Sequence, residues 1–418
     1  MAYASLITWG VFALFFAHLV LSWFLERRQQ NWVTRHQYHV PAAFQGQISE
    51  EEHLKSARYT LAKSRLSMWV SFVTFIEACC WIFAGGLSLL HALALDWAGD
   101  GLWGALVFVA LFVFVHSVIQ SPSALLNTFV VEAQFGFNRS SLRLWLIDQV
   151  KGLVLGLLIG LPLLAVILSL MQSDQPLWWL WAWGFWLVFQ SAMMVIAPKW
   201  LMPLFNEFKP IETSELTAKA EDLMDQVGFK AKDFQVMDAS RRSTHSNAFF
   251  TGLGREKRVV FYDTLLEKLN HNEVLAVLAH ELGHFKLKHV PAMLFTSALS
   301  SGLFLALVAG LLKHPEWMDA LGTHVATDRH VPVMLLMALY WILPPLLFFF
   351  KPFSAYWSRR REFQADPFAK QYTNSQDLGQ ALVKLYRGNA STLTPDPLYV
   401  WFHHSHPPAL TRLAHLNA

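Results

Sequence analysis

Two histidines and a glutamate on one short segment are the residues of this chain with the clearest chemical potential. His280 and His284 are four residues apart, so in a helix with about 3.6 residues per turn they project from the same face. Their imidazole rings can then bind one metal ion. Glu281 lies beside them, where it can take a proton from a water bound to that ion. The pattern therefore predicts a zinc site built for hydrolysis.

The sequence around this pattern predicts the helix that must present the three side chains. Asn270 is a candidate N-cap, and Glu273, three residues later, gives a capping-box-like start. Apolar residues then recur at helical spacing and give the helix one apolar face. These residues are Val274, Leu275, Val277, Leu278, Leu282 and Phe285. The alternative is a histidine-rich helix without a metal, and the partner segment described next favours the metal site.

A catalytic zinc ion takes three protein groups and keeps a fourth position for water, so the two histidines leave one ligand to be found. The best candidate is Glu362 in the segment Ser358–Asp366. Asp366 follows one turn later on the same face and can accept a hydrogen bond from a ligand histidine, which would fix the tautomer of that histidine. Alone, this segment would read as a solvated charged helix. With the metal helix present, we expect one Zn²⁺ ion per chain.

The composition is that of a polytopic membrane protein. Of 418 residues, 54% are hydrophobic and 15% are charged, and the mean hydropathy is +0.33. Long apolar runs explain this excess, and each is near the roughly 20 residues that a helix needs to cross about 30 Å of hydrocarbon. The seven runs are Ser5–Phe24, Leu66–Leu95, Leu102–Ile119, Val150–Leu170, Leu177–Ala197, Ala292–Leu312 and Val331–Phe350. The second run is long enough to tilt or to protrude from the bilayer.

Other residue types exclude several classes of protein. Cys79 and Cys80 are adjacent inside an apolar run, which excludes a disulfide framework and a cysteine-built metal site. The net charge of +3 is too small to indicate a nucleic-acid partner, and the sequence has no basic array with interleaved aromatic residues. We therefore expect the lipid bilayer and a peptide or lipidated peptide substrate as partners. The sequence does not predict an oligomeric state.

The distribution of basic residues predicts the orientation in the membrane. Lysines and arginines gather in the loops that follow the odd-numbered runs, whereas the opposite loops are poor in them. Examples are Arg27, Arg28, Arg35, Arg139, Arg143, Lys351 and Arg359. By the positive-inside rule, the amino terminus is outside, and the carboxyl terminus and the active site face the cytoplasm. An end without a retrieval signal and a start without a transit peptide favour a bacterial inner membrane.

These patterns divide the chain into four segments. Residues 1–198 hold the first five spans, 199–290 a catalytic insert with the zinc-binding helix, 291–350 the sixth and seventh spans, and 351–418 a tail with the third ligand. The insert is expected to be a small, strand-poor α/β unit with short β-like runs at Phe234–Met237 and Val259–Tyr262. The insert and the tail are each too small for a good core, so we expect them to pack together.

In the order and spacing of these motifs, the chain resembles the type I CAAX prenyl proteases, integral-membrane zinc peptidases of the gluzincin kind. The similarity runs nearly end to end and includes Glu132–Asn138, Ser243–Gly252 and Ser405–Pro408 as well as the two metal-binding segments. The resemblance implies a mainly α fold in which about seven tilted helices enclose a water-filled chamber. It also implies a small zincin-like α/β catalytic domain that caps this chamber on the cytoplasmic side.

The resemblance further implies roles for residues that spacing alone does not explain. Asn247 and Ala248 would hold the substrate backbone as an added strand, the alternative being an Asx turn before a short strand. His406 would hydrogen-bond the substrate carbonyl as it becomes an oxyanion, the alternative being an ordinary histidine in a proline-rich loop. Arg412 is expected to pair with a carboxylate near the site. We interpret Glu132–Asn138 as a structural loop beneath the active site, and Arg241, Arg242 and His245 as solvated or phosphate-near charges.

The sequence thus predicts a zinc-dependent membrane endopeptidase that cleaves near the carboxyl terminus of CAAX-type, possibly prenylated, substrates, with Glu281 activating the water. One alternative is a quality-control protease that cuts misfolded or translocon-stalled membrane chains with the same chemistry. A more distant alternative is a transporter or channel. That class predicts ionisable residues in the middle of several spans, but the clear candidates, Glu77 and His116, are few.

Overall fold

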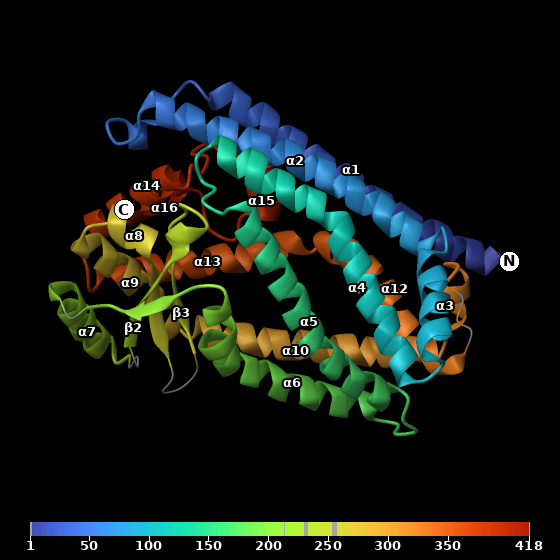
Figure 1. Ribbon diagram of the computed structural model, residues 1–418. Helices are drawn as coiled ribbons and strands as arrows, with labels where there is room; N and C mark the ends of the chain where they lie inside the picture. Colours follow the sequence, from blue (N-terminus) through green and yellow to red (C-terminus); the bar gives the residue numbers. More distant parts are fainter. Residues whose placement is uncertain are drawn as a thin grey trace.

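The computed structural model describes residues 2–212, 214–229, 233–252, 257–323, 325 and 327–417. Seven of its helices are long and apolar enough to cross a membrane, which confirms the number of spans predicted from the sequence. They are α1 (Ala2–His36), α2 (Glu50–Ile82), α4 (Leu102–Leu125) continued by η2 (Leu126–Glu132), α5 (Leu142–Met171), α6 (Trp178–Ile196), α10 (His289–Leu312) and α12 (Val331–Phe348). Figure 1 shows these long helices leading toward a small sheet at the end of the molecule opposite the amino terminus.

The surface of these helices fits a hydrocarbon solvent. Large apolar side chains such as Trp9, Phe295 and Leu303 are exposed, at 67%, 72% and 63% of their surface. In water such exposure would be unfavourable, whereas in a bilayer it is the normal state of a lipid-facing residue. The spans nevertheless share a packed interior that includes Phe108, Leu168 and Met334. The helices therefore form a bundle that presents an apolar outer surface to lipid.

The second apolar run differs from the prediction. Leu66–Leu95 is not one long span, because α2 ends at Ile82 and a separate helix, α3 (Gly86–Ala98), begins four residues later. Gly85 lies between them with φ +76°, a left-handed conformation that glycine adopts without the steric penalty of a Cβ atom. The chain turns there, and α3 packs along α4. The apolar run is thus shared between the end of a span and a shorter helix.

Three small elements follow α6. The helix continues as the π-helical η3 (Ala197–Leu201) and the short η4 (Met202–Leu204), so the predicted boundary at residue 198 falls inside this helical segment. The first strand, β1 (Phe208–Pro210), begins just beyond it. The remaining short 3₁₀ helices of the described chain are η1 (Ala42–Phe44), η5 (Ala239–Arg241) and η7 (Asp328–His330). The first strand thus lies four residues beyond this helical segment.

The insert is a small α/β unit built around one mixed sheet. Its strands are β1, β2 (Asp233–Met237), β3 (Ala248–Thr251) and β4 (Arg258–Tyr262), in the order β1-β2-β4-β3. β2 and β4 are parallel, whereas β3 pairs antiparallel with β4 and forms one edge of the sheet. The two β-like runs predicted from the sequence are β2 and β4, and the segment between them supplies the edge strand.

Helices cover this sheet and continue into the carboxyl-terminal segment. They are α7 (Glu215–Val227), α8 (Asp263–Lys268), α9 (His271–Lys286), α13 (Lys351–Lys370), α14 (Ser375–Gly388), α15 (Pro397–His403) and α16 (Ala409–Asn417). Val259 and Phe261 of β4 face a core that also contains Leu278 of α9 and Phe368 of α13. The insert and the tail thus share one hydrophobic core. The remaining helix, α11 (Glu316–Asp319), lies in the connection between α10 and α12.

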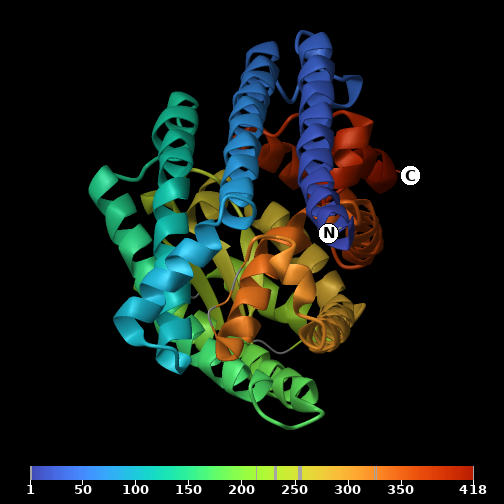
Figure 2. The same ribbon diagram turned by 90° about the vertical axis from the view of Figure 1, so that its right-hand side faces the viewer.

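The tail also contacts the membrane helices. Figure 2 shows the carboxyl-terminal helices next to α1. Arg28 of α1 donates two hydrogen bonds to the buried carboxylate of Asp396, at 3.3 and 2.9 Å. Gln29 accepts a hydrogen bond from the Asp396 backbone N–H at 2.7 Å. The first span therefore holds the turn that precedes α15.

The start of α9 has the capping box expected from the sequence. Asn270 accepts a hydrogen bond from the Glu273 backbone N–H at 3.0 Å, and the Glu273 carboxylate accepts one from the Asn270 N–H at 2.8 Å. Glu273 is fully buried, and its carboxylate also pairs with Lys384 of α14 at 2.7 Å. One glutamate thus caps the helix and joins it to the tail.

We predict that Glu273→Ala destabilises the protein, because it removes both a helix cap and a charged partner for Lys384. The expected loss is on the order of 2 kcal/mol, the worth of a hydrogen bond to a charged group. Glu273→Gln should cost less, since its amide oxygen can still accept from Asn270. Thermal unfolding in detergent micelles would measure both, with the exposed Glu221→Ala as control. Equal unfolding midpoints for Glu273→Ala and Glu221→Ala would contradict this role.

Candidate metal centre

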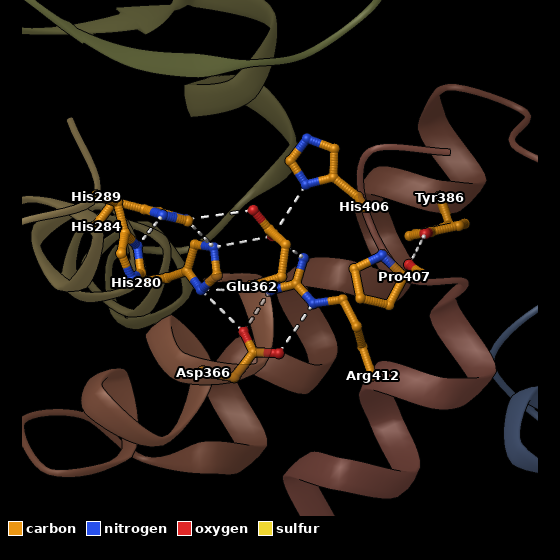
Figure 3. Close-up of polar contacts among 9 residues, drawn as sticks. All are labelled: His280, His284, His289, Glu362, Asp366, Tyr386, His406, Pro407 and Arg412. Atoms are coloured by element: carbon orange, nitrogen blue, oxygen red, sulfur yellow. Dashed lines mark hydrogen bonds and ion pairs between the residues drawn. The ribbon is translucent and has the colours of Figure 1, made fainter. Parts of the chain in front are cut away.

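The three predicted ligands lie together although they come from distant parts of the chain. His280 and His284 of α9 and Glu362 of α13 place one ligand atom each within 4.8 Å of one another. His280 Nε2 lies 3.4 Å from Glu362 Oε2, and His284 Nε2 lies 3.3 Å from Glu362 Oε1. Figure 3 shows the two imidazoles and the carboxylate converging on one point. The α9–α13 pair therefore forms a compact cluster of two nitrogens and one oxygen.

A glycine between the two histidines permits this approach of the helices. A Cβ atom on Gly283 would lie 3.2 Å from Ala365 Cα and 3.1 Å from the ring of Phe368. Such contacts are tighter than ordinary packing, so a larger residue would push α13 away from α9. Ala365 is itself small and fully buried. The spacing of the two helices, and with it the position of Glu362, depends on this pair of small residues.

The charge of the cluster fits a divalent cation. Burial raises the pKa of the Glu362 carboxyl, but the three neighbouring imidazoles lower it more, so its net pKa lies well below the usual range and the group is a carboxylate. Glu362 Oε2 is buried, and nitrogens of His406, His280 and Arg412 lie 2.9, 3.4 and 3.5 Å from it. A buried anion is tolerated where donors or cations meet it in this way. Two imidazoles and one carboxylate are a donor set typical of catalytic Zn²⁺, so the residues fit this metal.

Asp366 and Arg412 contact the ligand side chains of this cluster. Asp366 Oδ1 lies 2.9 Å from His280 Nδ1, and Arg412 donates hydrogen bonds to both carboxylate oxygens of Asp366. Burial raises the pKa of Asp366, but His280 and Arg412 lower it more, so Asp366 stays ionised. A proton held between Nδ1 and Asp366 leaves the Nε2 lone pair of His280 directed at the cluster. Arg412 is buried, and its guanidinium also lies 3.5 Å from Glu362.

Sequence reasoning missed His289, which contacts His284, and Gln364, which contacts His289. His289 Nδ1 lies 3.0 Å from His284 Nδ1, and His289 Nε2 lies 3.0 Å from Gln364 Oε1. If the amide oxygen accepts from Nε2–H, then Nδ1 of His289 accepts from His284 and leaves Nε2 of His284 free for a metal. The only sequence signal for this contact was the presence of a third histidine, His289, five residues after His284. A spacing of five residues does not place two side chains on the same face of a helix, so the contact was not predicted.

His406 lies on the open side of the cluster. It belongs to the loop between α15 and α16, and its Nδ1 is 2.9 Å from Glu362 Oε2. Its side chain is 65% exposed, in contrast to the buried Asp366 and Arg412. Tyr386 donates a hydrogen bond to the carbonyl of Pro407 at 3.3 Å and so holds this loop (Figure 3). The structure therefore places His406 where a substrate carbonyl at the cluster would be within its reach.

The other predicted site residues occupy less buried positions. Glu281 is half-buried on α9, one residue after His280. Asn247 is exposed immediately before β3, and its side-chain oxygen accepts a hydrogen bond from the Ala248 N–H at 2.8 Å. Its backbone carbonyl accepts one from Tyr262 at 3.0 Å. Asn247 and Ala248 thus begin the edge strand of the sheet.

Two contacts join the insert to the spans and correct the interpretation of the charges near Asn247. Arg242 is not a solvated charge, because it donates hydrogen bonds to both oxygens of Asp148 in α5, at 2.9 and 3.1 Å. His245 is not solvated either, since its ring stacks on Phe137 and its Nε2 lies 3.2 Å from the Glu132 carboxylate. These contacts position the chain that leads into β3.

The contact between His245 and Glu132 belongs to a larger group of hydrogen bonds around the Glu132 carboxylate. This carboxylate also accepts hydrogen bonds from Tyr59 at 2.6 Å and from Lys63 at 3.2 Å, both on α2. The loop around Glu132 thereby links two spans to the insert. These contacts give Glu132 a structural role, whereas the position of its loop beneath the active site stays a prediction.

Two histidines on one helix, a glutamate after the last span that could hold the same metal ion, and a bundle of membrane helices are together typical of an integral-membrane metallopeptidase. Comparison with known proteins supports the same class. Residues 29–207 match the family described as CAAX prenyl protease N-terminal, five membrane helices, and residues 210–418 match Peptidase family M48. The chain belongs to the CAAX prenyl protease family.

The relatives match over nearly the whole chain. CAAX prenyl protease 1 homolog of Arabidopsis thaliana is 33% identical, covering 90% of this chain and 89% of the relative. CAAX prenyl protease 1 of Saccharomyces cerevisiae is 31% identical, covering 93% and 92%. The crystal structure of S. mikatae Ste24p superimposes with a TM-score of 0.90 at 30% identity, covering 99% of this chain and 98% of that one. Because the chain belongs to a peptidase family, the protein is an enzyme. This excludes the alternative of a non-enzymatic transporter or channel.

We predict that Asp366→Asn weakens zinc binding roughly 10- to 100-fold, the usual cost of losing a group that orients a metal ligand. The reason is that the amide cannot balance Arg412 or hold the His280 proton as a carboxylate does. Competition with a chelating dye would measure the affinity in purified protein. Asp225→Asn, an exposed change on α7, is the matched control. An Asp366→Asn variant that binds zinc as tightly as this control would exclude the role.

Proposed function

We propose that this protein is a zinc-dependent endopeptidase that cleaves near the carboxyl terminus of CAAX-type substrates. The observation that carries the proposal is the cluster of His280, His284 and Glu362 inside a membrane protein whose relatives over nine-tenths of the chain are named CAAX prenyl proteases. The cluster supports metal-assisted hydrolysis. The names of the relatives support the class of substrate.

The residues at and around the cluster support a separate catalytic role for each of them. His280, His284 and Glu362 would hold the metal, and when bound, Zn²⁺ supplies a Lewis acid that lowers the pKa of a water toward about 7 and polarises the substrate carbonyl. Glu281 takes the proton of the attacking water and passes it to the leaving amine. His406 donates a hydrogen bond to the carbonyl oxygen as negative charge develops there.

The edge strand supports the mode of substrate binding. The sheet order leaves the outer side of β3 available for an added strand, and Asn247 and Ala248 lie at its start. A peptide bound in this way is held by main-chain hydrogen bonds, which depend little on side-chain identity. Asn247 adds a side-chain amide next to that edge. The substrate would therefore lie extended beside the insert.

The arrangement of the loops supports an active site that faces the cytoplasm. The turn between α1 and α2 lies at the same end of the bundle as the catalytic insert (Figure 1). Of the basic residues counted in the sequence, Arg35 lies in the last turn of α1, next to this turn, and Arg139 lies in the connection between η2 and α5. By the positive-inside rule this end is cytoplasmic.

We predict that Glu281→Gln keeps zinc but loses roughly 100- to 10,000-fold in kcat, the range attributed to general acid–base catalysis. The amide has the shape of the carboxylate but cannot accept a proton. Elemental analysis and peptide cleavage would be measured on the same preparation. His280→Ala should instead lose the metal. Full turnover by a zinc-loaded Glu281→Gln protein would end the proposed mechanism.

A second prediction tests the substrate class with a farnesylated peptide and its unlipidated twin. We expect the purified protein to prefer the farnesylated form in kcat/KM by roughly tenfold or more, equivalent to about 1.4 kcal/mol. A zinc chelator should stop both reactions, because both need the metal. Equal cleavage of the twins would favour the quality-control protease. Chelator-resistant cleavage would contradict the zinc mechanism.

A further inference from the structure

We infer that a polar cavity beside the metal cluster binds the carboxyl-terminal end of the substrate, with the terminal carboxylate at Lys63. The inference rests on the proposed peptidase function and adds the group by which the enzyme recognises a chain end. It assigns a role to a lysine that lies on a membrane helix, far in sequence from the zinc-binding motif.

The cavity adjoins the loop that carries His406. It has a volume of about 560 Å³ and is lined by residues from α1, α2, the end of α14 and the loop around His406. His406 belongs to this lining and is also 2.9 Å from the ligand carboxylate of Glu362. The His406 side chain therefore contacts both the cavity and the cluster. Its size falls in the range of pockets that enclose a small peptide-sized ligand.

The direction of an added strand leads into the same cavity. Antiparallel pairing is the more stable arrangement per residue, and β3 already pairs in this way with β4. A substrate antiparallel to β3 runs toward the start of that strand, so its carboxyl-terminal residues pass Ala248 and then Asn247. The next residue, Ser246, exchanges backbone hydrogen bonds with the Asn389 side chain at 3.0 and 3.3 Å. Asn389 lines the cavity.

The charges of the lining point to a carboxylate. Among the described residues that line the cavity, Lys63 is the one lysine or arginine. An ammonium group has three N–H donors, and two of those of Lys63 have partners, Asn127 at 2.8 Å and Glu132 at 3.2 Å. The side chain is 42% exposed, which leaves the third donor open to a ligand. A terminal carboxylate is an acceptor that can receive it.

Besides His406, which faces the metal cluster, the lining contains two further histidines and one acid. Burial lowers the pKa of His403 and of His404 to about 4, so both rings are neutral at neutral pH. The Glu26 carboxyl is buried in the wall, where it accepts hydrogen bonds from Ser64 and from Tyr399. Lys63 is thus the one lysine or arginine of the described lining; it is ion-paired with Glu132 at 3.2 Å and keeps one N–H donor for a ligand.

The test compares peptides that share one scissile bond and differ only at the end. One has a free carboxylate, one a carboxyl-terminal amide, and one is extended by several residues. The full-length zinc-loaded protein in lipid nanodiscs is used as wild type, Lys63→Met and Lys63→Arg. Arg58→Met, an exposed change on the same helix outside the cavity, is the control. The readout is the ratio of kcat/KM for acid over amide.

We expect the wild type and Arg58→Met to prefer the free acid by roughly tenfold or more, and Lys63→Met to bring this ratio close to one. Lys63→Arg should restore most of the preference, because it keeps the charge. Damage to the Glu132 contacts alone would slow both peptides equally and leave the ratio unchanged. A wild-type ratio near one, or a Lys63→Met protein with the wild-type ratio, would overturn the inference.

A second measurement needs no variant. The short carboxyl-terminal product is tested as an inhibitor of the wild type in its acid and amide forms, and the acid should inhibit more strongly. Equal inhibition by the two forms would count against the cavity as a carboxylate site. Absence of cleavage of every peptide by zinc-loaded wild type would instead remove the proposed function, and the inference with it.

Discussion

The site depends on the close contact between α9 and α13. No local chain geometry joins the ligands, because Glu362 follows His284 by 78 residues, with two spans in between. The small residues Gly283 and Ala365 let the two helix backbones meet, and that contact sets the distance between the imidazoles and the carboxylate. The ionised Glu362, Asp366 and Arg412 are then buried together, where each charge is tolerated because a partner of opposite charge stands beside it.

The insert and the tail are also tied directly to the membrane helices. Arg28 fixes the turn before α15, Arg242 ties the insert to α5, and Glu132 joins α2 to the segment before β3. Each link is a charged hydrogen bond between elements far apart in sequence. The shared hydrophobic core alone would not orient β3 and the His406 loop relative to the spans. The catalytic part is therefore one unit with the bundle and not an appended domain.

Sequence reasoning worked where the signal was local. The capping box of Asn270 and Glu273, the helical spacing of His280 and His284, and the number of spans follow from short-range patterns, and the structure has all of them. The choice of Glu362 needed the chemistry of zinc, which requires a third ligand, and the chain offered few acids after the last span.

The signals that failed were weak or non-local. The break between α2 and α3 lies inside a continuous apolar run, so hydropathy does not reveal it, and only the glycine pair at residues 85 and 86 marked the position. His289 meets His284 because Lys288 adopts a left-handed conformation, φ +58°, that turns the chain between α9 and α10. The cavity with Lys63 comes from elements of both the bundle and the tail. No pattern within one segment could have predicted it.

The junction of α12 and α13 has a mechanical consequence. α12 ends at Phe348 and α13 begins at Lys351, so the helix that carries Glu362 is almost a continuation of the last span. A span that is longer or shorter than the surrounding hydrocarbon relieves the mismatch by changing its tilt. The helix that carries the two histidines is joined to a span in the same way, because α9 ends at Lys286 and α10 begins at His289. A membrane of different thickness would therefore act on both halves of the ligand set, each through the joint between its helix and a span.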